Sequence, residues 1–324
     1  MSLLRINVAT DSVSLHDTPQ PVARRLRSFA SHPGPAVIMI HGYKYRPGSE
    51  HHCPHRKILG DADNHWPAQL QIGRTPHQDG TSIALGWDAR GTLRDVYSRA
   101  RHVSKRLATI VAMLRQHAPA RPVHIIAHSL GSELALSTLD HLPAHSVNRM
   151  ILLTGASYAQ RARHMLKSPA GRTVEVLNVT SRENDLFDLA FERLIPVEAE
   201  RDQSIGLGIN APNVLTLQLD CPEALSGLRS IGFDVASPTR RICHWSAYTR
   251  PGVMALYSAF LRNPAQLPLD HLASILPAAH ASRWSRLFPG LPRSFSCKRS
   301  LQRYMRRIAD NENALTHKPQ NEAA

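Results

Sequence analysis

Residues 123–131 read V-H-I-I-A-H-S-L-G, and this stretch decides the fold. Its first half is a short apolar run rich in β-branched side chains, which is typical of a buried parallel strand. Ser129 follows between the small residues Ala127 and Gly131, and the next residues, S-E-L-A-L-S-T-L, have the apolar spacing of a helix. A strand, a tight turn with a serine at its tip and then a helix form the context in which a G-x-S-x-G motif presents a nucleophile.

The motif departs from its usual form at one position, where Ala127 stands in place of the first glycine. The sharp turn needs flanking residues with almost no side chain, and a single methyl group is small enough to meet that need. A serine before a helix is also a favoured N-cap, so an ordinary capped helix is the alternative interpretation. Whether the chain also offers a base and an acid for Ser129 therefore decides between a nucleophile and an ordinary N-cap.

The composition is that of a folded protein. The chain has 324 residues, of which 42% are hydrophobic, and a formal net charge of +14 that favours contact with anionic surfaces. No apolar run reaches about 18 residues, which argues against a membrane-spanning helix. The N-terminus lacks a signal-peptide pattern, and the four cysteines include no C-x-x-C pair. We therefore expect a cytoplasmic protein with reduced thiols.

Strand and helix patterns alternate along most of the chain, which predicts an α/β fold with a mostly parallel central sheet flanked by helices on both faces. We expect residues 1–264 to form this α/β domain, with residues 44–80 as a lid or binding loop, or with a helix that the sequence pattern does not place. Residues 265–324 are expected to form a basic C-terminal extension with a disordered end. The expected strands are 3–15 (one or two), 36–40, 82–87, 123–127, 149–154, 173–180 and 213–219; the expected helices are 21–30, 93–116, 157–167, 187–194 and 249–261, besides the one after Ser129.

An activated serine needs a base and an orienting acid, which an open α/β sheet presents from loops at the carboxyl ends of its strands. The strand at 173–180 leads into S-R-E-N-D, where Asp185 is the candidate acid and Glu183 and Asp188 are reserves. His244 follows the last strand and is the candidate base. The order serine, acid, histidine is that of hydrolases with a nucleophile elbow.

The serine also needs an oxyanion hole, built from backbone N–H groups. The N–H of Leu130, directly after the serine, is one expected donor. The second is expected from the turn His41-Gly42-Tyr43, which follows the buried strand 36–40, with Tyr43 N–H as the donor. Gly42 allows the backbone to approach the substrate, and we expect His41, Gly42 and His128 to contribute to substrate binding.

Together these motifs resemble the α/β-hydrolase superfamily, and the resemblance spans roughly residues 36–261. It implies a triad of Ser129, His244 and Asp185 that cleaves carboxylic esters through an acyl-enzyme, as in serine esterases and lipases, with no cofactor or metal. The fold hosts many reactions, so a thioesterase or acyltransferase with the same triad stays open. The motifs that carry the resemblance are H-G-Y at 41–43, A-H-S-L-G at 127–131, S-R-E-N-D at 181–185 and H-W-S-A-Y at 244–248.

Two further features bear on partners. The cluster His51, His52, Cys53 and His55 lacks the spacing of metal ligands, so we expect no metal there. The basic, aromatic segment 283–307 favours an anionic membrane surface, while nucleic acid is supported by charge alone. The substrate is expected to be a small-molecule or lipid ester. A non-catalytic scaffold that binds an anionic partner is the alternative to an enzyme, and no oligomeric state is predicted.

Overall fold

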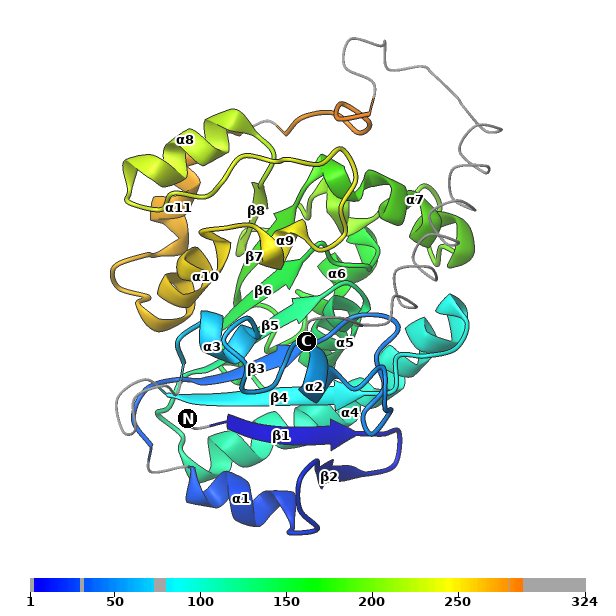
Figure 1. The fold of residues 1–324 in the computed structure, drawn as a ribbon, viewed down its shortest axis with the longest axis vertical. Helices are drawn as coiled ribbons and strands as arrows, with labels where there is room; N and C mark the ends of the chain where they lie inside the picture. The colour runs from blue at the N-terminus through cyan, green and yellow to red at the C-terminus, as the bar shows by residue number, and fades with distance from the viewer. Residues whose placement is uncertain (1–2, 30–31, 73–79, 279, 288–324) are drawn as a thin grey trace, which may run out of the picture. The chain divides into compact units, whose positions relative to one another are not determined.

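One sheet organises the chain (Figure 1). The structure is a computed structural model that describes residues 3–29, 32–72, 80–278 and 280–287. Within them, eight strands form a sheet in the order β2-β1-β4-β3-β5-β6-β7-β8, in which all neighbours are parallel except the edge pair β2 and β1. The strands are β1 (Leu3–Val8), β2 (Val13–Leu15), β3 (Ala36–Ile40), β4 (Thr81–Trp87), β5 (Val123–His128), β6 (Arg149–Leu153), β7 (Glu175–Thr180) and β8 (Val214–Gln218).

Helices cover both faces of this sheet, as the sequence predicts. One face packs against α1, α4, α5 and α6, and the other against α3, α8, α10 and α11. The helices are α1 (Val22–Ser28), α2 (Pro54–Lys57), α3 (Trp66–Gln69), α4 (Leu93–His117), α5 (Leu130–Thr138), α6 (Ala159–Met165), α7 (Asp185–Leu194), α8 (Pro222–Ser230), α9 (Ser246–Thr249), α10 (Val253–Arg262) and α11 (Leu269–Ile275).

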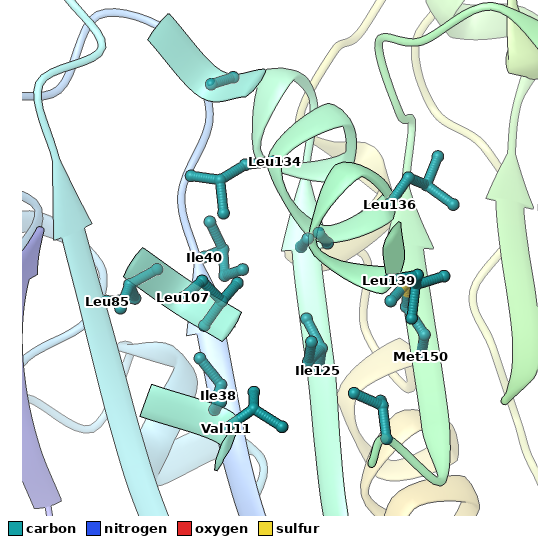
Figure 2. Close-up of a cluster of buried hydrophobic side chains, with 14 of the residues drawn as sticks. Ile38, Ile40, Leu85, Leu107, Val111, Ile125, Leu134, Leu136, Leu139 and Met150 are labelled. Carbon is teal, nitrogen blue, oxygen red and sulfur yellow. The ribbon is translucent and has the colours of Figure 1, made fainter. Parts of the chain in front are cut away.

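Successive side chains of a strand point to opposite faces of the sheet, and helices cover both faces, so the central strands are buried on both sides. In β3, Ile38 and Ile40 join the core under α4 and α5, whereas Val37 and Met39 join the core on the other face. A parallel strand covered on both faces needs an uninterrupted apolar run, and β3 has one. Figure 2 shows the first core, in which side chains from the two helices interdigitate with those of the strands.

Most predicted elements are confirmed, with differences at their ends and in the C-terminal third. Short helices α2 and α3 lie in the stretch 44–80, where the sequence pattern places no helix. Helices α8 and α11 were not predicted. Leu269 and Leu272 of α11 belong to the buried core, so the domain continues past the predicted boundary at residue 264. Residues 1–283 form one compact unit and residues 284–324 a second.

The basic segment 283–307 falls almost wholly in the second unit. Residues 288–324 lie outside the described residues, so the prediction that the C-terminal end is disordered is not tested. Among the residues that are described, no helix is both long and apolar enough to cross a membrane. The described cysteines, Cys53, Cys221 and Cys243, are free thiols.

Candidate active site

Ser129 sits in a strained turn between β5 and α5. Its φ of 52° and ψ of −125° are uncommon for a residue with a side chain and persist only where the surroundings enforce them. The Ser129 N–H donates to Leu153 O (3.0 Å), and the Ser129 carbonyl accepts from the N–H groups of Ser132 (2.9 Å) and Ala156 (3.0 Å). These bonds hold the turn from β6 and from the helix, so the conformation is that of a nucleophile elbow rather than an ordinary N-cap.

Two glycines make room for the turn. A Cβ on Gly42 would lie 2.7 Å from Ser129 Cβ, and a Cβ on Gly131 would lie 2.6 Å from the carbonyl oxygen of His41. Both distances are shorter than real Cβ contacts, so the loop after β3 packs directly against Ser129, and the first turn of α5 packs directly against the end of β3. Ala127, at the other flank of the motif, is fully buried and its methyl group is accommodated.

The two expected oxyanion donors flank this contact. Leu130 is the first residue of α5, so its N–H has no acceptor within the helix. Tyr43 is fixed on both sides, because its hydroxyl donates to Gly91 O (2.5 Å) and the following Lys44 N–H donates to Ala89 O (2.9 Å). The Tyr43 N–H itself has no recorded acceptor among the described residues. The geometry is therefore compatible with an oxyanion hole at these two amides.

His41 supports the loop, which differs from its expected role in substrate binding. The Trp87 N–H donates to His41 Nε2 (3.1 Å), so the ring proton is on Nδ1, which donates to Gly42 O (2.9 Å). The Trp87 indole N–H donates to the His41 carbonyl (3.1 Å). Complete burial lowers the pKa of His41 to about 3. With both ring nitrogens engaged, His41 fixes the turn and is not free to bind a ligand.

His128 joins the nucleophile turn to the loop that carries the base. Its Nε2–H donates to the carbonyl oxygen of His244 (3.1 Å), which also accepts from Thr154 Oγ1 (3.1 Å). The rings of His128 and His244 are 4.6 Å apart between centroids, and burial lowers the pKa of His128 to about 4. The residue is buried and positions His244, whereas the sequence predicts contact with substrate.

His244 has the hydrogen bond that a catalytic base needs, with an unexpected partner. Its Nδ1–H donates to Asn184 Oδ1 at 2.6 Å, which leaves Nε2 without a proton. Phe187 stacks on the imidazole with centroids 4.6 Å apart and planes 24° apart. Burial, followed by the neighbouring His128, lowers the pKa of His244 well below its ordinary value.

The sequence predicts that Asp185 orients His244, but in the structure the partner of the imidazole is Asn184, and Asp185 pairs with Arg182 instead. Arg182 Nη1 lies 3.2 Å from Asp185 Oδ1, and both side chains are 1% exposed. Arg182–Asn184 forms the short 3₁₀ helix η2, and α7 begins at Asp185. Consecutive side chains on such a turn point in directions more than 100° apart, so only one of the pair can face the imidazole. Here Asn184 faces it, and Asp185 is the buried counter-ion of Arg182.

The two reserve acids also have other partners. Glu183 forms a buried ion pair with Arg250 and accepts from Ser181 Oγ (2.9 Å). Asp188 accepts from Ser204 Oγ (2.8 Å), and burial raises its pKa to about 6. Neither carboxylate is among the hydrogen-bond partners of His244.

The serine and the histidine share one site without a direct hydrogen bond. Among the described residues, Ser129 Oγ has no recorded bond to His244, and the link between them runs through the side chains of His128 and Thr154 to the His244 backbone. Catalytic hydrogen bonds in empty enzymes are often long and tighten when substrate binds. The arrangement thus holds a serine in a strained turn, the imidazole of His244 and two backbone amides at the carboxyl ends of the central strands.

Sequence reasoning missed Asn184 and the aromatic residues at this site. Phe187 and Trp245 flank the imidazole, with ring centroids 6.4 Å apart from each other, and Trp245 is 38% exposed. Their positions beside S-R-E-N-D and in H-W-S-A-Y were the available signal. They give the site a partly exposed apolar wall.

The histidine-rich loop packs into the domain where it is described. His55 Nε2–H donates to Asn7 Oδ1 of β1 (2.8 Å), and the buried Trp66 meets Tyr248 with centroids 5.1 Å apart. Across the described ranges, no three His, Cys, Asp or Glu side chains are grouped so as to hold a metal ion. Residues 73–79 of the predicted lid lie outside these ranges.

The comparisons with known proteins agree with this architecture. Residues 25–178 match the model of a family described as "alpha/beta hydrolase of unknown function (DUF900)". No curated protein matches the chain at a significant level.

Solved structures overlap only loosely with the chain. MenH from S. aureus is 9% identical, with 58% of this chain and 86% of that chain covered at a TM-score of 0.31. The lin2722 product of Listeria innocua is 11% identical, with 71% and 95% covered at 0.39. Phospholipase PlaB from Legionella pneumophila is 14% identical, with 48% and 39% covered at 0.27.

Overlaps at these TM-scores carry no argument of their own. The assignment rests on the family match, which includes the H-G-Y turn and the A-H-S-L-G elbow, and on the mostly parallel sheet with helices on both faces. The chain therefore has the architecture of an α/β hydrolase, and its residues 25–178 match a family of that kind.

Proposed function

We propose that the protein is a serine hydrolase that cleaves carboxylic esters, with Ser129 as nucleophile and His244 as general base. The observation that carries the proposal is the strained conformation of Ser129, at φ 52°, against Gly42 and beside an imidazole whose Nε2 is unprotonated. Strain of this kind persists where function requires it.

In the proposed mechanism, His244 Nε2 removes the proton from Ser129 Oγ as the oxygen attacks the ester carbonyl. The amides of Tyr43 and Leu130 stabilise the oxyanion, and the alkoxide leaves with a proton from His244. Water, activated by the same imidazole, then hydrolyses the acyl-enzyme. Asn184 keeps the ring proton on Nδ1, so that Nε2 faces the reaction.

An amide supports this cycle less well than a carboxylate does. A carboxylate would stabilise the imidazolium that forms in each step, whereas Asn184 contributes only a neutral hydrogen bond. We therefore expect the turnover of simple esters to be slow. Phe187 and Trp245 favour an apolar acyl group, which is consistent with a lipid-derived ester.

The test is covalent labelling of the purified full chain with a fluorophosphonate. Stoichiometric labelling of the wild type that is lost in both Ser129→Ala and His244→Ala supports the proposal. Ser230→Ala, an exposed serine at the end of α8, is the matched control and should label fully. Failure of the folded wild type to label, or retention of the label in Ser129→Ala, would overturn the assignment.

Matched oxygen and thio esters of one acyl chain, with and without an alcohol acceptor, separate the reaction types. Faster release from the oxygen ester into water supports the esterase. Preference for the thioester identifies a thioesterase, and transfer to the alcohol identifies an acyltransferase.

Asn184 also favours a second candidate, a non-catalytic scaffold that binds an anionic partner. Such a protein would keep the fold and lose the acid, and it would not label. In either case we propose that the basic segment 283–307 contacts anionic lipid. Sedimentation with phosphatidylserine vesicles, but not with phosphatidylcholine vesicles, would support this, and it should weaken with salt.

A further inference from the structure

A cleft of about 480 Å³ lies beside α6, outside the residues assigned to the reaction. It runs between α6 with its C-terminal extension and the loop at 198–202. The lining includes the basic side chains of Arg161, Arg163 and Lys167, with His164, on the first side and the acids Glu198 and Asp202 on the second.

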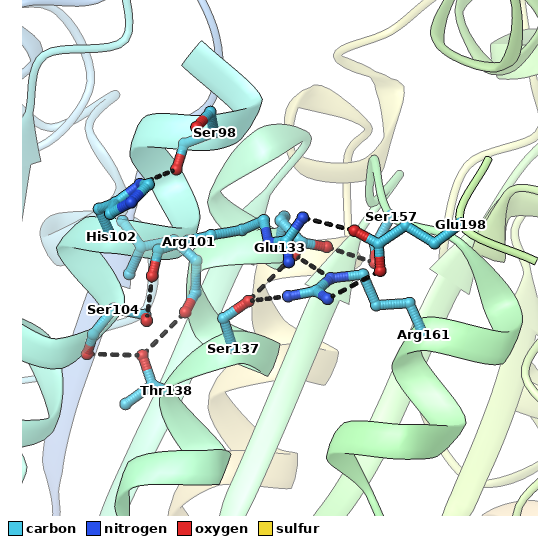
Figure 3. A network of polar contacts seen from close by, with 11 residues as sticks. Ser98, Arg101, His102, Ser104, Glu133, Ser137, Thr138, Ser157, Arg161 and Glu198 are labelled. Atoms are coloured by element: carbon cyan, nitrogen blue, oxygen red, sulfur yellow. Dashed lines mark hydrogen bonds and ion pairs between the residues drawn. The ribbon is translucent and has the colours of Figure 1, made fainter. Parts of the chain in front are cut away.

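Both acids of the cleft are already engaged. Glu198 pairs with Arg161 (3.3 Å) and with Arg101 of α4 (2.5 Å), as Figure 3 shows. Asp202 Oδ1 accepts from the backbone N–H groups of Gln160 (2.9 Å) and Gln203 (2.8 Å). Glu198 is thus shared by two arginines, whereas Asp202 is held by backbone amides and keeps its negative charge.

The guanidinium of Arg161 forms an ion pair with the buried carboxylate of Glu133. Its Nε lies 2.6 Å from Glu133 Oε1, and Glu133 also accepts from Ser157 Oγ (2.6 Å) (Figure 3). Glu133 lies on α5, four residues after Ser129, and is 1% exposed. Arg161, a lining residue of the cleft, is thus held in place by a buried network.

The remaining cations are not paired. Across the described residues, no carboxylate is recorded within ion-pair distance of Arg163 or Lys167. The two residues are four apart, at and just beyond the end of α6, where like charges repel. An anion between them would remove that repulsion and gain charge-assisted hydrogen bonds, for which phosphate is the best-matched group.

Two exposed aliphatic side chains precede the lining residue Glu198 in the sequence. Leu194 is 56% exposed and Val197 is 47% exposed, which makes them the two most exposed large aliphatic side chains among the described residues. Val197 directly precedes Glu198, and the adjoining Ile195 carbonyl accepts from the hydroxyl of Tyr158, a lining residue of the cleft (2.6 Å). The exposed aliphatic side chains thus belong to the segment that joins the cleft through Ile195 and Glu198.

We propose that this cleft binds an alkyl phosphate of the lipid type, with the phosphate between Arg163 and Lys167 and the aliphatic chain on Leu194 and Val197. The site is separate from Ser129 and does not depend on the proposed hydrolysis. Its connection to the elbow helix runs through Arg161 and Glu133.

The test measures binding of three probes to the full chain by calorimetry below micellar concentrations. Dodecyl phosphate carries both head and chain, inorganic phosphate carries the head alone, and dodecyl maltoside carries the chain alone. We expect dodecyl phosphate to bind at least about tenfold more tightly than either of the other two. Equal affinity for dodecyl maltoside would show a plain detergent site, and equal affinity for inorganic phosphate would show a head-group site only; either result overturns the proposal.

Variants locate the site. Arg163→Gln with Lys167→Gln should weaken dodecyl phosphate binding about tenfold, and Leu194→Ser with Val197→Ser should reduce it to the level of inorganic phosphate. Lys167 is exposed, so Lys167→Gln alone tests the head-group contact without a burden on folding. Arg24→Gln, an exposed arginine on α1, is the matched control and should bind like the wild type. Equal weakening by Arg24→Gln would show non-specific charge attraction and overturn the site.

Discussion

His244 Nδ1 lies 2.6 Å from the side-chain oxygen of Asn184, and the neighbouring Asp185 is turned into an ion pair with Arg182. An amide thus occupies the position where a carboxylate would orient and charge-stabilise the base. Because Asn184 accepts through its side-chain oxygen, the ring proton of His244 stays on Nδ1, as it would beside a carboxylate. What the amide does not supply is the negative charge beside the imidazolium.

Asn184→Asp should therefore increase turnover. The corresponding exchange of acid for amide lowers kcat by about 10⁴ in a serine protease, so we expect the reverse exchange here to raise kcat at least about tenfold. The new charge should also raise the pKa of His244, which moves the acid limb of the kcat/KM profile to higher pH. Steady-state rates with a p-nitrophenyl ester from pH 4 to 8 measure both effects. A fall in kcat, or an unmoved acid limb, would show that residue 184 does not orient the base.

Asp185→Asn should act on stability instead. It leaves the buried Arg182 guanidinium without its counter-ion, and breaking a buried pair in this way costs roughly 3–5 kcal/mol. Urea denaturation measures the loss. Asp140→Asn, at an exposed acid after α5, is the control and should stay within about 0.5 kcal/mol of the wild type. A stable Asp185→Asn protein that has lost activity would instead return Asp185 to the catalytic site.

This pair shows what the sequence can and cannot predict. Local sequence patterns predict the buried strands β3 and β5 and the turn at Ser129, and the structure contains all three. They also predict that the acidic segment and His244 follow the serine in the chain. The choice between Asn184 and Asp185 depends on where the 3₁₀ turn begins, and adjacent polar residues give no sign of that. Helix α8 is not predicted from the sequence, and Gly227, a poor helix former, lies in its middle. A Cβ there would lie 2.2 Å from Ile275 O, so the glycine serves the packing of α11, a contact that local sequence does not reveal.

Acid should destabilise the fold through its buried histidines. Burial lowers the pKa values of His41 and His124 to about 3 and of His128 to about 4, while the unfolded chain takes up these protons near pH 6.5. Between those values the unfolded state binds more protons, so stability falls as the pH falls, by up to about 1.4 kcal/mol per pH unit for each histidine. The pKa of Asp188 is raised to about 6, so this one carboxyl group has the opposite effect on stability between about pH 4 and 6, and the buried histidines outnumber it.

Urea denaturation at several pH values from 7.5 to 4.5 checks this dependence. His124 Nδ1 has no hydrogen-bond partner in the described structure, so His124→Leu removes one titrating group at little other cost. Its slope against pH should be smaller by about one proton. A variant with the wild-type slope would mean that His124 is not buried in the neutral form.

Gly42→Ala should block the active site. The added methyl group would lie 2.7 Å from Ser129 Cβ and 2.9 Å from His128 Nδ1, so the loop that carries the Tyr43 amide must move away from the serine. Loss of one oxyanion donor lowers kcat by about 10²–10³. Fluorophosphonate labelling rates and ester turnover measure the effect. Gly48→Ala strains the same loop, because Gly48 has a φ of 75°, but its methyl group has no atom within 4 Å; it should keep its labelling rate, and equal losses in both variants would point to loop strain instead.

Trp245→Ala should change substrate preference more than rate. Trp245 is partly exposed and belongs, with Phe187, to the apolar wall beside the imidazole. Each methylene that loses contact with this wall costs up to about 0.8 kcal/mol, so kcat/KM for an octanoyl ester should fall about tenfold relative to the acetyl ester. The acetyl ester is the internal control, because its acyl group is too short to depend on the wall, and its kcat should change little. An equal fall for both esters would show that Trp245 positions His244 rather than the acyl chain, and would remove the structural reason for expecting a lipid-derived substrate.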